Sequence, residues 1–183
     1  MDALSLLLER RSQPRLSAPA PAGEALENIK QAALRAPDHA GLMPWQFIVC
    51  EGQGLERLGN IFEQSAIENG KTDKEIERAP QLPLRAPMVI VAIAKFQENP
   101  KVPRVEQVAS AGCAVMAMQM AAQAQGFNGI WRTGAYAQCD VVRNALNLAE
   151  DDELVGFLYL GTPVTNAPAP AKKEAEVFFS HWR

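Results

Sequence analysis

The sequence predicts an α+β fold in which helices flank a mixed central sheet. Two kinds of pattern alternate along its 183 residues. Apolar residues recur every three or four positions in several stretches, as they do on one face of a helix, and short apolar runs such as MVIVAIA (88–94) lie between these stretches. A chain of this length fits one domain, covering 1–183, with a sizeable core.

The first half of the chain predicts three helices and two strands. Asp2 is a good N-cap for a helix that runs to about Arg10, and the proline-rich connection SQPRLSAPAPAG follows it. A second helix ends before Pro37, because proline disfavours helical geometry at the preceding residue. QFIVC (46–50) reads as a short buried strand. A third helix follows from Leu55, with ENGKTDKE as its polar exit.

The second half is organised around one long helix. MVIVAIA is continuously apolar, so we expect a strand that is covered on both faces. The stretch 105–125 is helical and apolar on nearly every face, which places it in the interior or in a subunit interface. GIW begins another strand, VVRNAL is a helix, and ELVGFLYLG (153–161) is the last strand. The end of the chain, 162–183, contains VFFSHW, and so aromatic a segment is expected to pack on something.

Composition argues against several classes of protein. The net charge is −3, with 18 basic and 21 acidic residues, whereas nucleic-acid partners favour a basic excess. No window approaches the ~18 apolar residues of a membrane span, and no signal peptide is apparent. Cys50, Cys113 and Cys139 form no CxxC, so reduced thiols in a cytoplasm are the simpler interpretation. The two histidines have no metal-ligand spacing, so no metal site is expected.

The first cluster of candidate functional residues is Arg10, Arg11 and Ser12, together with Arg15, at the end of the first helix. Two arginines and a hydroxyl at an irregular bend could form a fork for a phosphate group. The alternative is that the bases only complement the negative end of the helix dipole.

The second cluster lies in RAPDHAGLMPWQF (35–47). Pro37 and Pro44 fix φ and would rigidify a turn that presents Arg35 and His39, as a preorganised polar site requires. The alternative is that Trp45 is a core aromatic residue, that Arg35 caps a helix and that His39 is solvated.

The third cluster lies in GFNGIWRTGA (126–135). Gly126, Gly129 and Gly134 allow a positive φ or a close backbone approach. Between them, Trp131, Arg132 and Thr133 form a polar and aromatic exit from a strand. An ordinary strand edge with an exposed arginine is an equally good interpretation.

Together, and in this order, the motifs resemble those of the nitroreductase family of flavoproteins. They are RRSxxR, RAPDHxxxxPWxF, SAGCAVMAMQMAAQAQGF, GIWRTGA and FLYLGTP, and the resemblance spans residues 2–163. It implies the nitroreductase-like fold, an obligate homodimer that buries the long helix, and FMN bound at the subunit interface. The extension 162–183 would pack on that dimer. Many members carry a basic pair soon after the GxP turn, whereas Lys172 and Lys173 come later here.

The resemblance also implies roles for individual residues. Arg10, Arg11 and Ser12 would grip the phosphate and polar ring edge of FMN, and Arg35 and His39 would contact the same FMN. Trp131, Arg132 and Thr133 would complete the site from the opposite chain, and Trp45 would support the site rather than contact FMN. A path for the nicotinamide nucleotide is assigned to Ala121, Ala122, Gln123, Ala124, Gln125 and Gly126.

The implied function is a two-step oxidoreduction. NADH or NADPH gives a hydride to FMN and leaves, and a nitroaromatic or quinone-like acceptor then takes two electrons. The cofactor carries this chemistry, so no catalytic side chain is expected. One alternative is an FMN-dependent dehydrogenase or desaturase of a small metabolite. Another is a flavin-binding protein without enzymatic activity.

Overall fold

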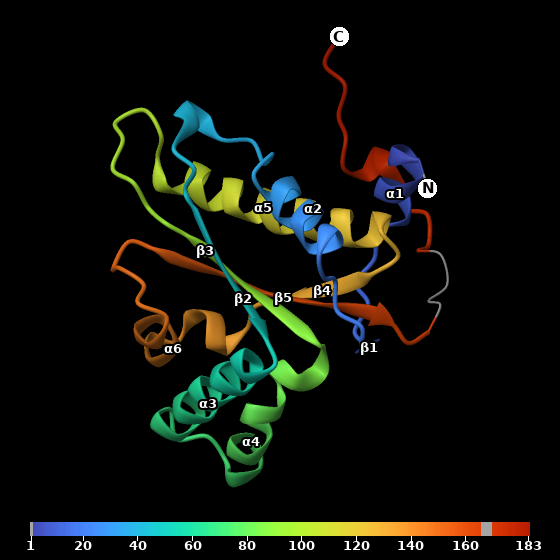
Figure 1. The fold of residues 1–183 in the computed structure, drawn as a ribbon. Helices are drawn as coiled ribbons and strands as arrows, with labels where there is room; N and C mark the ends of the chain where they lie inside the picture. The colour runs from blue at the N-terminus through green and yellow to red at the C-terminus, as the bar shows by residue number, and fades with distance from the viewer. Residues whose placement is uncertain (1, 166–169) are drawn as a thin grey trace.

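The centre of the molecule is a five-stranded sheet (Figure 1). A computed structural model describes residues 2–165 and 170–183. The sheet order is β1-β5-β3-β2, and β4 pairs with β5 on the edge that β3 leaves free. The strands are β1 (Leu16–Ser17), β2 (Trp45–Glu51), β3 (Met88–Ala94), β4 (Asn128–Arg132) and β5 (Glu153–Pro163).

The α+β prediction is confirmed, with one correction to the sheet. Every strand pairing among the described residues is antiparallel, whereas the sequence predicts a mixed sheet. The reason is the position of β5. β3 and β4 run in the same direction and are joined by a long helix, as in a parallel crossover, but β5 lies between them and runs against both.

Helices cover both faces of this sheet (Figure 1). α2 (Glu24–Ala33) and the 21-residue α5 (Arg104–Ala124) lie on one face. α3 (Gln53–Glu68), α4 (Asp73–Arg78) and α6 (Asp140–Ala145) lie on the other. Every residue of β3 is buried, which confirms the prediction that MVIVAIA is covered on both faces.

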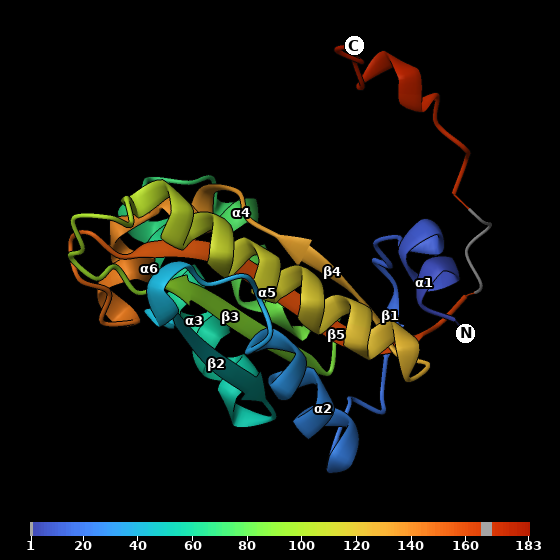
Figure 2. The same ribbon diagram turned by 90° about the horizontal axis from the view of Figure 1, so that it is seen from above.

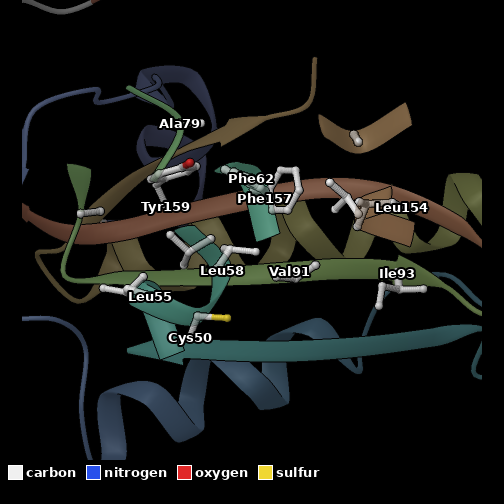
Figure 3. Close-up of a cluster of buried hydrophobic side chains, with 14 of the residues drawn as sticks. Cys50, Leu55, Leu58, Phe62, Ala79, Val91, Ile93, Leu154, Phe157 and Tyr159 are labelled. Atoms are coloured by element: carbon white, nitrogen blue, oxygen red, sulfur yellow. The ribbon is translucent and has the colours of Figure 1, made fainter. Parts of the chain in front are cut away.

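The strands divide their side chains between two hydrophobic clusters. Val89, Val91 and Ile93 join the cluster on the α3 side, while Met88 and Ile90 join the cluster on the α5 side, because successive strand residues point to opposite faces. On the α3 side, the rings of Phe62 and Phe157 meet edge to face at 5.1 Å (Figure 3).

Two elements lie where the sequence predicts only connections. β1 interrupts the proline-rich segment, and its pairing with Thr162 and Pro163 is set by a distant part of the chain. α4 lies inside the predicted polar exit of α3. A capping box starts it, since the Glu75 carboxylate accepts bonds from the Thr72 amide (3.1 Å) and hydroxyl (2.7 Å). This signal is present in the sequence as TDKE.

Several apolar side chains have no cover in this single chain. α1 (Ala3–Glu9), beside the C-terminal end of α5, exposes Leu4, Leu7 and Leu8 (Figure 2). The tail from residue 170 leads away from the sheet and its helices, and its Trp182 is 98% exposed (Figure 2). The tail therefore does not pack on the body of its own chain.

Candidate functional site

Two of the predicted clusters, Arg10–Ser12 and Trp131–Thr133, meet at one edge of the sheet. The amide of Gln13 donates a 2.8 Å hydrogen bond to the carbonyl oxygen of Gly129, the second residue of β4. The side-chain nitrogen Nε2 of Gln119, on α5, donates to the same oxygen (2.8 Å) and to the carbonyl oxygen of Arg11 (3.4 Å). Gln119 is buried, so these bonds hold Arg10, Arg11 and Ser12 beside the start of β4.

β4 presents unpaired backbone groups at this edge. Because the Gly129 carbonyl faces away from β5, the peptide groups of Trp131, two residues on, face the same way. Among the described residues, no hydrogen bond outside the sheet is found for the Trp131 amide or carbonyl. The edge therefore offers a backbone donor and acceptor to a planar ligand.

Two arginines at this edge have unsatisfied nitrogens. Arg11 Nε and Arg132 Nε are both buried, and neither has a hydrogen-bond partner in the described part of the chain. A buried donor without a partner is costly, so such atoms are rare in folded proteins. Both guanidinium groups are therefore suited to a polar or anionic ligand that the chain itself does not supply.

A cavity of about 410 Å³ lies beside these residues on the α3 side of the sheet. Arg132 lines it and lies over the Tyr159 ring, 5.7 Å from the ring centre, a cation–π contact. Burial raises the pKa of the Tyr159 hydroxyl to about 12, although Arg132 and Arg85 act in the opposite direction. Tyr159 is therefore protonated at neutral pH.

Trp131 points to the other face of the sheet. Its indole nitrogen donates a 3.1 Å hydrogen bond to the Val155 carbonyl oxygen. This approach requires a glycine at position 156, because a Cβ there would lie 2.5 Å from the Trp131 indole nitrogen. The three predicted glycines of this segment also behave as expected. Gly126 and Gly134 have φ of +87° and +76°, and a Cβ on Gly129 would lie 2.3 Å from the Tyr159 carbonyl oxygen.

The other two predicted FMN ligands lie on the segment that follows α2, and His39 is near the N-terminal end of α5. His39 Nδ1 is 2.7 Å from a carboxylate oxygen of Glu106, and the exposed Arg35 follows the end of α2. The Trp45 indole donates to the Ser110 hydroxyl at 3.0 Å, and that hydroxyl donates to the Pro37 carbonyl oxygen. Trp45 thus ties the turn to α5, in agreement with a supporting role.

The structure therefore divides the predicted site into two groups. Glu106, beside His39, and Gln119, beside Arg11, are thirteen positions apart on one helix, which is about 20 Å at a rise of ~1.5 Å per residue. Within one chain, Arg10–Ser12 are grouped with Trp131–Thr133 and separated from Arg35 and His39. This grouping differs from the one that the resemblance implies, in which Trp131–Thr133 come from the opposite chain.

The segment assigned to the nicotinamide nucleotide is occupied with internal contacts. Gln125 Nε2 donates to the carbonyl oxygens of Ala25 (3.2 Å) and Ala121 (2.9 Å), and Asn28 Nδ2 donates to the Gln125 side-chain oxygen (3.1 Å). Ala122 is fully buried. These contacts hold α2 against the end of α5, and residues 121–126 do not line the 410 Å³ cavity. Gln123 Oε1, in the same segment, is buried and has no hydrogen-bond partner in the described part of the chain, and the nucleotide path stays a prediction.

Arg85 and Tyr159 are among the cavity residues that the sequence analysis did not identify. Arg85 comes from the turn before β3, and Tyr159 from the middle of β5. Arg85 carries a signal that could have found it, since Arg85-Ala86-Pro87 repeats the tripeptide Arg35-Ala36-Pro37. Tyr159 has no such signal, because it reads as one more residue of a buried strand.

Neither a metal centre nor a membrane span is found in the described ranges 2–165 and 170–183. No group of three or more His, Cys, Asp or Glu side chains lies close enough there to hold a metal ion. Nor does any helix in these ranges combine the length and the apolar character needed to cross a bilayer.

The fold and the motifs have close counterparts in known proteins. The family model described as "Nitroreductase family" matches residues 7–162. A protein of Escherichia coli (strain K12) named "Putative NAD(P)H nitroreductase YdjA" is 58% identical over 167 residues, which are 91% of each chain. A Haemophilus influenzae protein named "Putative NAD(P)H nitroreductase" is 42% identical over 168 residues, again 91% of each chain.

Solved structures share the fold at lower identity. A nitroreductase-like family protein from Bacillus cereus superposes with a TM-score of 0.85 at 21% identity, covering 100% of this chain and 96% of its own. A Desulfovibrio desulfuricans structure, described as "a putative nitroreductase in complex with fmn", has a TM-score of 0.73 at 21% identity, covering 98% of this chain and 96% of its own. The matched residues and the identity to full-length relatives lead to one conclusion: the chain belongs to the nitroreductase family.

Proposed function

We propose that this protein is an FMN-dependent NAD(P)H oxidoreductase that acts as a homodimer on nitroaromatic or quinone-like acceptors. The observation that carries the proposal is the pair of buried, unpartnered Nε atoms of Arg11 and Arg132 at one sheet edge. Family membership and the names of the relatives agree with it. FMN, when bound, would supply hydride acceptance from NAD(P)H and two-electron transfer to the acceptor.

The groups at this edge fit a flavin. A flavin combines an apolar tricyclic ring, a hydrogen-bonding pyrimidine edge and a phosphate. The outward peptide groups of Trp131 match a pyrimidine edge, and Arg10, Arg11 and Ser12 offer charged and hydroxyl donors to a phosphate. Arg132 and Arg85 line the adjoining cavity and would supply positive charge to a flavin bound there.

A second copy of the chain would complete the site. His39 is about 20 Å along α5 from Arg11, so we propose that His39, and Arg35 from the same turn, reach the FMN that is bound by Arg11 of the partner subunit. Exposed apolar side chains beside this edge favour such a dimer. They are Leu4, Leu7 and Leu8 on α1, and Ala109, Cys113 and Met116 on one stripe of α5. The tail from residue 170 would then pack on the partner subunit.

The chain's own residues would bind and orient the reactants. The rigid Pro37–Pro44 turn, fixed to α5 through Trp45 and Ser110, would keep Arg35 and His39 in place before FMN arrives. Tyr159 would remain a neutral hydrogen-bond donor throughout the neutral pH range, because burial raises its pKa to about 12. No side chain needs to act as a nucleophile.

The test is cofactor content followed by kinetics. The purified protein is expected to be a yellow dimer that releases FMN rather than FAD on denaturation. Double-reciprocal plots with a nitroaromatic or quinone acceptor are expected to be parallel, since donor and acceptor would use one flavin in turn. A colourless monomer that takes up no added FMN would refute the proposal. Slow reduction of the bound FMN by both NADH and NADPH would instead indicate a non-enzymatic flavin protein.

A further inference from the structure

A second cavity lies away from the sheet edge, although it shares Leu82 and Tyr136 with the first. It has a volume of about 550 Å³ and lies between α3, α4 and the start of α6. Cys139, Lys71, Arg78 and Tyr136 are among the residues that line it. Tyr136 stacks on Phe62 with ring centres 4.3 Å apart, so one wall is a fixed aromatic surface. The proposed function uses none of these groups.

The Cys139 thiol in this cavity is held by two polar side chains. The Ser65 hydroxyl lies 3.0 Å from its sulfur, and Asn69 Nδ2 donates to the same sulfur at 3.3 Å. Asn69 Nδ2 also donates to the Ser65 carbonyl oxygen at 2.7 Å, which fixes the amide in place. Both groups can donate to a thiolate, so they favour the charged form of the sulfur.

The balance of these effects favours the thiolate. Burial raises the pKa of the Cys139 thiol, but hydrogen bonds from Ser65, the Val142 amide, Asn69 and the Val141 amide together outweigh it, so the pKa is lowered. The other two cysteines differ in position, since Cys50 is buried in the core and Cys113 lies on the apolar stripe of α5.

The walls of the cavity carry unpaired positive charge. Lys71 and Arg78 are exposed, and neither forms an ion pair within the part of the chain that the structure describes. Among the described residues that line the cavity, the one carboxylate is that of Glu75, and it accepts bonds from the amide and hydroxyl of Thr72. Two cations around a thiol and an aromatic wall suit a ligand with a sulfur centre and carboxylates.

We propose that this cavity is an S-thiolation site, in which Cys139 forms a mixed disulfide with a small, carboxylate-bearing disulfide. The Cys139 thiolate attacks one sulfur of the disulfide, and a new S–S bond forms as the original S–S bond breaks. The second half leaves as a thiolate and takes a proton from water. Lys71 and Arg78 pair with the carboxylates of the retained half. This inference is independent of flavin binding.

The test uses glutathione disulfide as the probe. The protein is first reduced and then freed of the reducing agent. It is mixed with glutathione disulfide at neutral pH, and the adducts are located by intact mass and peptide mapping. Cys139 is expected to be the first cysteine to react. Its rate should be at least about threefold higher than that of the thiols in the same chain unfolded in guanidinium chloride. The reason is that a lower pKa increases the fraction of thiolate by more than it decreases the nucleophilicity of each thiolate. Cys139→Ser should abolish the fast phase. Preferential labelling of Cys50 or Cys113, or equal rates in the folded and unfolded chain, would overturn the proposal.

A second disulfide probe, which carries no charge, distinguishes recognition of the carboxylates by Lys71 and Arg78 from the reactivity of the Cys139 thiol. Lys71→Gln and Arg78→Gln should each slow the reaction with glutathione disulfide by up to about fivefold, since a surface ion pair contributes up to ~1 kcal/mol. Both variants should react normally with the uncharged bis(2-hydroxyethyl) disulfide. Ser65→Ala should slow both reactions. Two results would show that the cavity does not recognise carboxylates. In the first, Lys71→Gln and Arg78→Gln react with glutathione disulfide at the unaltered rate. In the second, both variants are slowed equally with the charged and the uncharged disulfide.

Discussion

Replacing Arg11 by alanine is expected to weaken FMN binding by roughly one to two orders of magnitude. The Nε of Arg11 is buried and lacks a partner in the described chain, so in the proposed site it donates to FMN. Loss of a hydrogen bond to a charged group costs about 1.5–3 kcal/mol, and each ~1.4 kcal/mol is a tenfold change. The measurement is the FMN dissociation constant of the apoprotein, by quenching of flavin fluorescence.

Two controls make this result specific. Arg57→Ala removes an exposed arginine from α3 and should leave FMN affinity unchanged. Arg11→Lys keeps the charge but removes Nε, so it should recover only part of the affinity. Equal affinity of Arg11→Ala and the unaltered protein for FMN would place the phosphate or ring elsewhere.

The division of the site between two chains has its own test. Arg11→Ala and Arg35→Ala homodimers are expected to bind FMN weakly. If the two arginines reach one FMN from different chains, a mixed dimer of these variants has one site with both defects and one intact site. Half of its sites should then bind FMN with the original affinity. If both arginines come from the same chain, every site carries one defect and no recovery occurs.

Replacing Asp152 by alanine is expected to destabilise the fold by about 3 kcal/mol. The Asp152 carboxylate is buried, forms an ion pair with Lys95, and accepts bonds from the amides of Phe96 (3.1 Å) and Ala149 (2.8 Å). Removing one partner of a buried ion pair costs ~3–5 kcal/mol, and we take the lower limit because Lys95 is 35% exposed. For a chain of this size, the thermal midpoint should fall by roughly 6–12 °C.

The loss should depend on pH in a defined direction. Burial raises the pKa of Asp152, but hydrogen bonds from Lys95, Ala149 and Phe96 outweigh it, so the folded-state pKa is lowered. The stabilisation is therefore present above the unfolded pKa of ~3.9 and is lost as pH falls through the folded value. As the pH falls through the folded-state pKa of Asp152, the free energy of unfolding of Asp152→Asn should approach that of the unaltered protein. Asp151→Ala, an exposed neighbour, is the matched control, and an equal loss in this variant would contradict the role of the buried pair.

The sequence by itself determined the local elements and the family. Helical spacing and a continuous apolar run predict α2, α3, α5 and β3 within a few residues, because these signals depend only on neighbours along the chain. Gly126, Gly129 and Gly134 could be recognised because only glycine suits a positive φ or a close approach. The ordered motifs, from RRSxxR to FLYLGTP, were sufficient to identify the nitroreductase family.

Only the tertiary structure decided which candidate residues come together. Arg11 lies beside β4 because Gln13 bonds to Gly129, 116 positions later, whereas His39 bonds to Glu106 at the other end of α5. The antiparallel sheet and the cavity around Cys139 have the same origin, since both depend on how distant elements pack. Spacing along the chain fixes the conformation of a segment but not its distant neighbours, which are set by burial of apolar surface across the whole sheet.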